Sequence, residues 1–330
     1  MWFEKLTGFK ESTPADVRSK IIIEGSRLIS MINHRVFEFG KLEWPSLKEL
    51  KELNQLLSEF DNKINVSEVI GDTQILHSNP ENQNAVFQVA SQFNLLEMVN
   101  PTVTPERGID RYEYDFTQGP ASAIACGAGT IYRNYFVPIN NQLGQSENCQ
   151  INCLEEIEKA LDNDSNSFWE MKNGYSLMDE HGIRKITEII NGLTAKEYEQ
   201  LKDLLKIGIQ WETEVTIAPS KHLVTQVYCS ALPISYCFFN PEHGETFAKF
   251  ILQASYEATF HVALQNYKQT GCRILYLTMV GGGAFGNNKE WIIDAIKNSL
   301  IKFKNTPLDV RIVSFNAPNP ALQPLIKYFT

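Results

Sequence analysis

The chain has 330 residues, of which 43% are hydrophobic and 21% charged, and this balance is typical of a soluble globular protein with a sizeable core. Its net charge of −9 argues against non-specific binding to DNA or RNA, which requires a basic surface. No apolar run reaches the length of a membrane-spanning helix, and the first residues, MWFEKLTGFKESTPADV, lack a signal-peptide core. We therefore expect neither nucleic acid nor membrane as a partner.

Cysteine usage indicates a reduced, cytoplasmic protein. Six cysteines in a chain of this size do not resemble a disulfide framework. Cys149 and Cys153 form a C-x-x-x-C pair, but no histidine or second pair stands at zinc-site spacing. We expect no cofactor and no metal site, although loop carboxylates could hold a magnesium ion.

Residues 12–62 have a helical pattern. Ser12 or Thr13 can cap a helix that has Pro14 in its first turn, and leucines recur at spacings of three and four in 46–60. We predict that residues 1–65 form a helical N-terminal extension, outside a second unit that spans 66–330.

From residue 66 onwards, short apolar runs alternate with helical patterns. The runs at 72–78 and 207–217 fit strands, whereas 245–268 and 289–303 fit amphipathic helices. This alternation implies parallel strand pairing with helices on both faces of the sheet. The predicted fold class is α/β, a three-layer α/β/α domain with a mixed sheet. The strands of that sheet are predicted at 85–90, 224–229, 273–280 and 309–315.

The stretch LTMVGGGAFGNNKEWIIDAI, residues 277–296, places glycines between a buried strand and a helix. Asn287 and Glu290 have the spacing of a capping pair, so we expect the helix to begin near Asn287 or Asn288. Free amides at such a helix N-terminus suit a diphosphate. A tight turn without a ligand is the simpler alternative. The spacing is neither the Rossmann pattern nor a P-loop, which disfavours a nucleoside triphosphate hydrolase.

Four stretches together resemble a family of known enzymes. They are GGGAFGN (281–287), FQVASQFNLLEM (87–98), YEYDFTQGPASAIACGAGTIYRNYF (112–136) and VTQVYCSALP (224–233). They are similar to the ligand loops of divergent, MavL-like macrodomain ADP-ribosylhydrolases, which are distantly similar to poly(ADP-ribose) glycohydrolases. The resemblance covers about residues 70–316 and implies a macrodomain-like fold.

The resemblance also implies that ADP-ribose is the ligand. The Gln-Glu-Glu signature of poly(ADP-ribose) glycohydrolases is absent after residue 119, and Ser91-Gln92-Phe93-Asn94 stands where ordinary macrodomains have Asn-Ala-Ala-Asn. The catalytic residue therefore does not carry over, and cleavage of poly(ADP-ribose) chains is not expected. The implied ligand-binding residues are Gln92, Phe93, Asn94, Gln118, Gly119, Gly281, Gly282, Gly283, Ala284, Phe285, Gly286 and Asn287.

Cleavage at the anomeric carbon of a ribose requires a carboxylate, and acids gather in 97–115. Asp115 is the first candidate because it stands beside the glycine turn at 119, although it could simply cap that turn. Glu106 is the second candidate, with solvated charge as its alternative. Glu97 stands among apolar neighbours, where an acid needs a partner or a role.

Three functions remain open from the sequence. The first is a hydrolase that removes mono-ADP-ribose from a modified protein side chain, with arginine as the expected linkage and ubiquitin as a candidate carrier. The second is a reader module that binds ADP-ribose without cleaving it. The third is a scaffold that only keeps the fold, and the four glycines in 281–286 argue against it because a ligand-free turn needs fewer.

Overall fold

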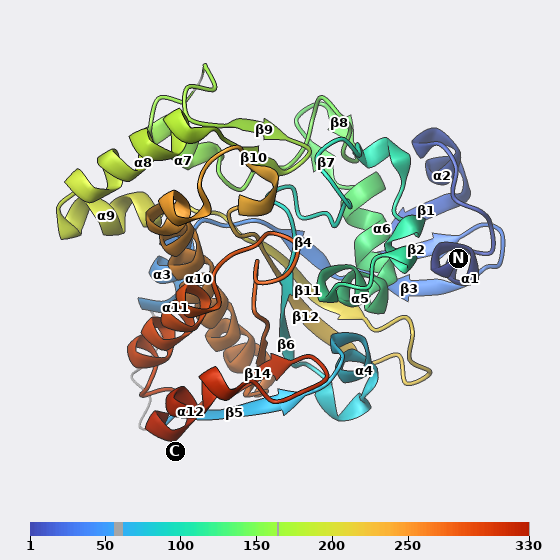
Figure 1. The fold of residues 1–330 in the computed structure, drawn as a ribbon. Helices are drawn as coiled ribbons and strands as arrows, with labels where there is room; N and C mark the ends of the chain where they lie inside the picture. Colours follow the sequence, from blue (N-terminus) through green and yellow to red (C-terminus); the bar gives the residue numbers. More distant parts are fainter. Residues whose placement is uncertain (56–61, 164, 330) are drawn as a thin grey trace.

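The computed structural model describes residues 1–55, 62–163 and 165–329, and its centre is a seven-stranded mixed sheet (Figure 1). Five neighbouring strands, from β12 to β5, run parallel, and β11 and β4 extend the sheet by antiparallel pairing. In sheet order the strands are β4 (Lys41–Glu43), β11 (Gly208–Glu214), β12 (Leu223–Cys229), β6 (Val86–Ala90), β13 (Ile274–Leu277), β14 (Asp309–Ser314) and β5 (Asn65–Ile70). All four predicted strands are present and adjacent.

Helices cover both faces of this sheet (Figure 1). On one face α10 (Glu245–Thr270) packs on β6, β12 and β13, and it is covered by further helices. These are α3 (Leu47–Gln55), α8 (Glu180–Gly192), α9 (Ala195–Lys202) and α11 (Lys289–Lys302). The other face carries α4 (Thr73–Ser78), α5 (Gln118–Ala125) and α6 (Gly127–Tyr135). The predicted three-layer α/β/α architecture with a mixed sheet is confirmed.

Smaller elements complete the chain. Two short hairpins, β7–β8 and β9–β10, follow α6, and α12 packs against β5. Among the described residues, no helix is long and apolar enough to cross a membrane. The bounds of these elements are β7 (Pro138–Ile139), β8 (Gln142–Leu143), α7 (Glu155–Ala160), β9 (Glu170–Lys172), β10 (Tyr175–Leu177) and α12 (Gln323–Phe329).

The N-terminal segment differs from the helical prediction. After α1 (Trp2–Thr7) and α2 (Pro14–Lys20), the chain forms an antiparallel sheet of β1 (Ile21–Glu24), β2 (Arg27–Ser30) and β3 (Val36–Glu38). The alternation of buried Leu28 and Ser30 with more exposed neighbours marks a strand, which the β-branched run Ile21–Ile23 also favours. β4 then enters the main sheet, while the division of the chain at residue 65 stays a prediction.

Of two further local predictions, one was wrong and the other falls partly outside the described residues. Residues 73–78 form α4 rather than a strand, because the Asp72 side chain accepts a hydrogen bond from the Gln74 amide and caps the helix. The leucine-rich helix predicted in 46–60 is present as α3, and its residues 56–60 lie outside the described residues.

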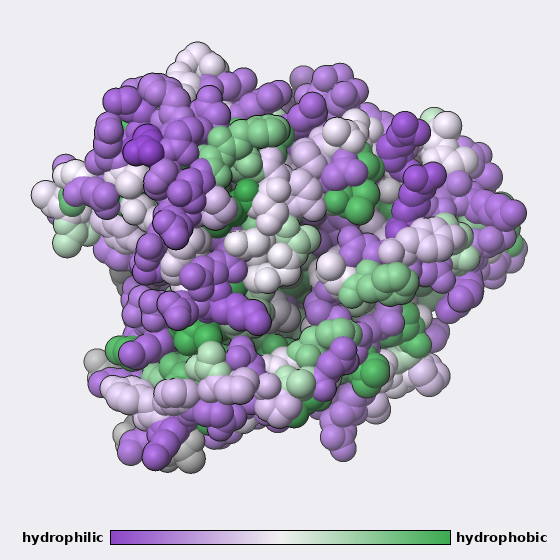
Figure 2. Space-filling model, in the orientation of Figure 1, coloured by the Kyte–Doolittle hydropathy of each residue, from purple (hydrophilic) through white to green (hydrophobic). Residues whose placement is uncertain are grey.

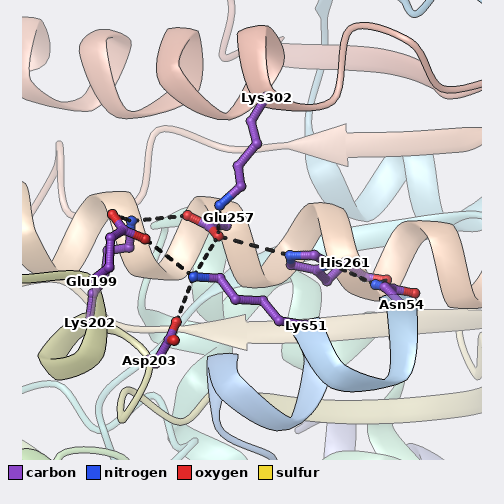
Figure 3. Close-up of polar contacts among 8 residues, drawn as sticks. All are labelled: Lys51, Asn54, Glu199, Lys202, Asp203, Glu257, His261 and Lys302. Atoms are coloured by element: carbon purple, nitrogen blue, oxygen red, sulfur yellow. Dashed lines mark hydrogen bonds and ion pairs between the residues drawn. The ribbon is translucent and has the colours of Figure 1, made fainter. Parts of the chain in front are cut away.

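A buried network of charges joins the helices on the α10 face (Figure 3). Glu257 of α10 pairs with Lys51 of α3 at 3.1 Å, with Lys202 of α9 at 3.1 Å and with Lys302 of α11. Burial would raise the pKa of Glu257, but the three lysines outweigh it and hold this pKa at about 2. The network therefore ties three helices to α10, away from the loops at the strand ends.

Candidate functional site

A cavity of about 550 Å³ opens at the carboxyl ends of β6, β13 and β14, the edge at which α/β sheets bind ligands. Figure 2 shows a hollow at the centre of this face, with both hydrophobic and hydrophilic residues at its rim. Ten of the predicted site residues line the cavity: Gln92, Glu97, Asp115, Gln118, Gly119, Gly281, Gly282, Gly283, Ala284 and Phe285.

The glycine loop after β13 leaves part of its backbone available to a ligand. The amides of Gly282, Gly286 and Asn287 donate within the loop, to Met279, Gly283 and Gly281 carbonyls. Within the described chain, the amides of the three intervening residues, 283–285, have no hydrogen-bond partner, and Gly283 and Ala284 are exposed. This loop can therefore present successive donors to an anion.

Conformation explains the first glycine of the loop. Gly281 has φ +78°, and a Cβ at this position would collide with the Ala231 side chain. At Gly283, by contrast, a Cβ would meet nothing within 4 Å. The absence of a side chain at Gly283 keeps the surface of the loop open rather than relieving strain.

The helix after the loop starts one residue later than a cap at Asn287 would require. Asn288 is the N-cap of α11, and its side chain accepts from the Glu290 amide at 2.9 Å. Asn287 is buried, and its backbone amide closes the loop by donating to the Gly281 carbonyl at 2.9 Å. Its side chain donates to the Leu232 carbonyl at 2.8 Å. Lys289, which the sequence analysis missed, is the one cationic side chain among the residues that line the cavity.

Glu97 is the acid that the cavity holds most deeply. It is 6% exposed, and its Oε1 atom is buried with no hydrogen-bond partner among the described residues. Burial raises the pKa of Glu97 well above its usual range, the charge of Asp115 raises it further, and Arg133 opposes the shift. Burial therefore favours the neutral, proton-bearing form of the Glu97 carboxyl group.

Asp115 lies between the 3-10 helix η3 (Asp110–Tyr114) and α5, and it lines the same cavity as Glu97. Its Oδ1 accepts from the Thr117 amide at 2.9 Å, which is the turn-capping bond that the sequence also allowed. The carboxyl group thus has one structural bond and one free oxygen beside the cavity. The two interpretations of Asp115 are compatible.

Four other predicted residues are structural in this fold or distant from the cavity. Glu106 accepts from the Glu147 amide at 2.9 Å and does not line the cavity. Phe93 packs in the main core, and Asn94 is buried, where its side chain donates to Gln150 and accepts from the Leu96 amide. Gly286 and Asn287 follow the cavity-lining part of the glycine loop and do not line the cavity themselves.

Gln92 and Gln118 shape the cavity through loop contacts. The Gln92 amide group bonds the backbone N–H and carbonyl of Met98 at 2.8 and 3.2 Å, which fixes the loop that carries Glu97. Gln118 accepts from the Thr73 amide at 2.8 Å and donates to Asp72 at 3.3 Å. The polar atoms of both side chains form hydrogen bonds within the protein, so these residues position the loops.

An aromatic wall completes the site, and sequence reasoning missed two of its three members. Tyr175 of β10 lies with its ring centroid 5.0 Å from that of Tyr236 and 5.3 Å from that of Phe285. The Tyr175 hydroxyl donates to the Met98 carbonyl at 2.6 Å. Tyr175 and Tyr236 stand far from the glycine loop in sequence, so no spacing pattern connects them to it. The described residues contain no cluster that could hold a metal ion.

Comparison with known proteins gave structural likeness only. No protein-family model matches the chain, and no curated protein matches it by sequence. The chain is similar to poly(ADP-ribose) glycohydrolase from Thermomonospora curvata, with TM-score 0.46 and 11% identity over 96% of this chain and 97% of that chain. It is also similar to the Deinococcus radiodurans enzyme in complex with ADP-ribose, with TM-score 0.42 and 11% identity over 87% and 92% of the two chains.

Proposed function

We propose that the protein is an ADP-ribosylhydrolase that removes mono-ADP-ribose from a modified protein side chain. One observation carries the proposal: a single cavity joins the free amides of residues 283–285 to Glu97, whose pKa is raised by burial, and to a second carboxyl group, Asp115. Amide donors suit the pyrophosphate, and paired carboxyl groups suit hydrolysis at an anomeric carbon.

In this proposal the pyrophosphate rests on the amides of Gly283, Ala284 and Phe285, with the Lys289 ammonium as counter-charge. Such a local anion site offsets the acidic character of the whole chain, whose net charge is −9. The aromatic wall of Tyr175, Tyr236 and Phe285 gives the sugars and base an apolar surface.

The proposed reaction uses the two carboxyl groups in different protonation states. The Asp115 carboxylate accepts a proton from water as the water oxygen bonds to C1″ of the distal ribose. The bond between C1″ and the side-chain atom breaks, and Glu97 donates its proton to that leaving atom. Water thus supplies the new hydroxyl group, and the products are ADP-ribose and the unmodified side chain.

Arginine is the acceptor that this site suits best. A guanidinium group is cationic, and the Asp115 carboxyl group at the cavity can carry the opposite charge. Ubiquitin, modified on arginine, is the carrier protein that we propose to test first. A reader function would use the same amides and aromatic wall without the proton transfers.

The test combines calorimetry and turnover. Titration with free ADP-ribose measures binding, and incubation with proteins ADP-ribosylated through arginine, glutamate or serine measures release of ADP-ribose. We expect binding of ADP-ribose and fastest release from arginine. Binding without release from any linkage would support the reader, and absence of binding would contradict both functions.

A further inference from the structure

The N-terminal segment is anchored to the acidic loop that leads to Asp115. The indole N–H of Trp2 donates to the Ile109 carbonyl at 3.1 Å, and the Trp2 backbone N–H donates to Glu113 at 2.7 Å. Trp2 and Tyr112 also belong to one hydrophobic cluster that joins α1 to α5 and α6. In Figure 1 this segment lies beside those two helices.

Glu11 accepts three hydrogen bonds in this contact between the N-terminal segment and the rest of the fold. Its Oε2 accepts from the amides of Ile109 and Asp110 at 2.8 and 2.7 Å, and its Oε1 accepts from the Tyr135 hydroxyl at 2.7 Å. A Cβ at Gly108, whose φ is +88°, would collide with Oε2 of Glu11. One carboxyl group therefore links the N-terminal segment, α6 and the start of η3.

The segment that Glu11 holds contacts the backbone of both acids of the site. Tyr112, in η3, accepts a hydrogen bond from the Glu97 amide through its hydroxyl at 2.8 Å. The Asp115 amide donates to the Tyr112 carbonyl at 3.2 Å. A displacement of η3 would thus move the backbone of Glu97 and of Asp115 together.

We propose that Glu11 is a positioning residue of the site, which aligns Glu97 and Asp115 by fixing the start of η3. This inference rests on the proposed function, because alignment matters only if the two groups act on a ligand. A misplacement of about 1 Å in a catalytic group can cost about 100-fold in rate. Glu11 itself does not line the cavity, so ADP-ribose binding should not depend on it.

The anchoring also depends on pH. Burial raises the pKa of Glu11 to about 7, against the hydrogen bonds from Tyr135, Ile109 and Asp110 that lower it. The titratable groups that face Glu11 are Asp110, Tyr112 and Tyr135. Release of the segment would return Glu11 to water, where its pKa is near 4.5. Ionisation therefore favours release, and anchoring weakens as the pH rises from 4.5 to 7 and stays constant above 7.

The test compares Glu11→Ala and Glu11→Gln, with Glu4→Ala of α1 as the matched control. Glutamine can accept from both amides and donate to Tyr135, so it keeps the anchor without the charge. We expect Glu11→Ala to lower kcat about 10- to 100-fold with ADP-ribose affinity within about threefold. Amide exchange at Ile109 and Asp110 should accelerate at least about tenfold. Glu11→Gln should restore both and remove the pH dependence of exchange protection.

Each other outcome contradicts either the anchor itself or its role in aligning Glu97 and Asp115. Unchanged exchange at Ile109 and Asp110 in Glu11→Ala would overturn the anchor, and faster exchange with unchanged kcat would overturn its role in alignment. If Glu11→Ala does not fold, Tyr135→Phe, which removes one of the three bonds, must still show faster exchange. No turnover by the wild type would contradict the proposed function and the role in alignment, whereas the exchange data would still decide whether the anchor exists.

Discussion

The carboxyl group of Glu97 packs against the first turn of α5, so closely that a Cβ on Gly119 would lie 2.5 Å from Oε2 of Glu97 and 2.5 Å from the Ala90 carbonyl oxygen. Real Cβ atoms do not approach so near, and position 119 therefore requires glycine in this arrangement. The requirement connects the end of β6, the loop that carries Glu97 and the helix after Asp115. It explains why a glycine lies within the first turn of a buried helix.

Glu97→Gln should abolish most of the turnover. The replacement keeps the shape of the side chain but cannot donate an acidic proton, so we expect turnover to fall at least about 100-fold. Affinity for free ADP-ribose should stay within about tenfold, because the proton transfer belongs to the transition state. Steady-state kinetics and calorimetry on the same preparation check this. A Glu97→Gln variant with full activity would exclude Glu97 as the acid.

Substitution of Asp115 should lower turnover, whereas substitution of Glu106 should leave it nearly unchanged. Asp115→Ala should lower turnover by orders of magnitude, since the proposed base is removed, with modest loss of ADP-ribose affinity. Glu106→Ala is the matched control, because this acid lies in the same acidic stretch but does not line the cavity. The rates of both variants on one ADP-ribosylated substrate decide the matter. Equal losses would mean that the effect comes from the loop and not from the cavity.

Gly283→Glu should weaken ADP-ribose binding without unfolding the protein. A Cβ at Gly283 meets nothing within 4 Å, and its carboxylate would repel the pyrophosphate. Gly192→Glu, at another glycine whose Cβ would meet nothing within 4 Å, is the control for the added charge. Calorimetric titration should show at least about tenfold weaker binding for Gly283→Glu alone. Gly282→Glu is a poorer probe, since a Cβ there would lie 3.1 Å from Ile292.

Glu257 should contribute stability that is lost in acid. Its folded pKa of about 2 lies below the ordinary 4.5, so the contribution is present above pH 4.5 and disappears as the pH falls towards 2. Glu257→Gln should destabilise the fold by about 3–5 kcal/mol at pH 7, because three lysines lose their buried partner. Urea unfolding at several pH values checks this. Glu188→Gln, in an exposed pair, should cost at most about 1 kcal/mol.

Periodicity and glycine placement predicted the central sheet and the position of the glycine loop. Strands such as 85–90 and 309–315 are apolar runs with clear boundaries, so the local sequence alone identifies them. The helix-start signals at 12–14 are correct, because Thr13 caps α2. That helix ends after seven residues, however, and the signals gave no indication of the β1–β3 sheet that follows it.

The site was only partly predictable, because its contacts are long-range. The sequence shows that Glu97 is an acid among apolar neighbours, but only the fold shows that α5 buries its carboxyl group. Asn94 has a side chain typical of ligand loops, yet Gln150 and the Leu96 amide use its polar atoms. Tyr175 and Tyr236 come from separate segments that meet only in three dimensions.

The most direct test of the central claim is a time course of ADP-ribose release from arginine-ADP-ribosylated ubiquitin, followed by mass spectrometry of both products. Wild-type protein should liberate free ADP-ribose and restore the mass of unmodified ubiquitin, and Glu97→Gln should do so at least about 100-fold more slowly. A wild-type protein that binds ADP-ribose but leaves arginine, glutamate and serine linkages intact on ubiquitin and on other modified proteins would contradict the account.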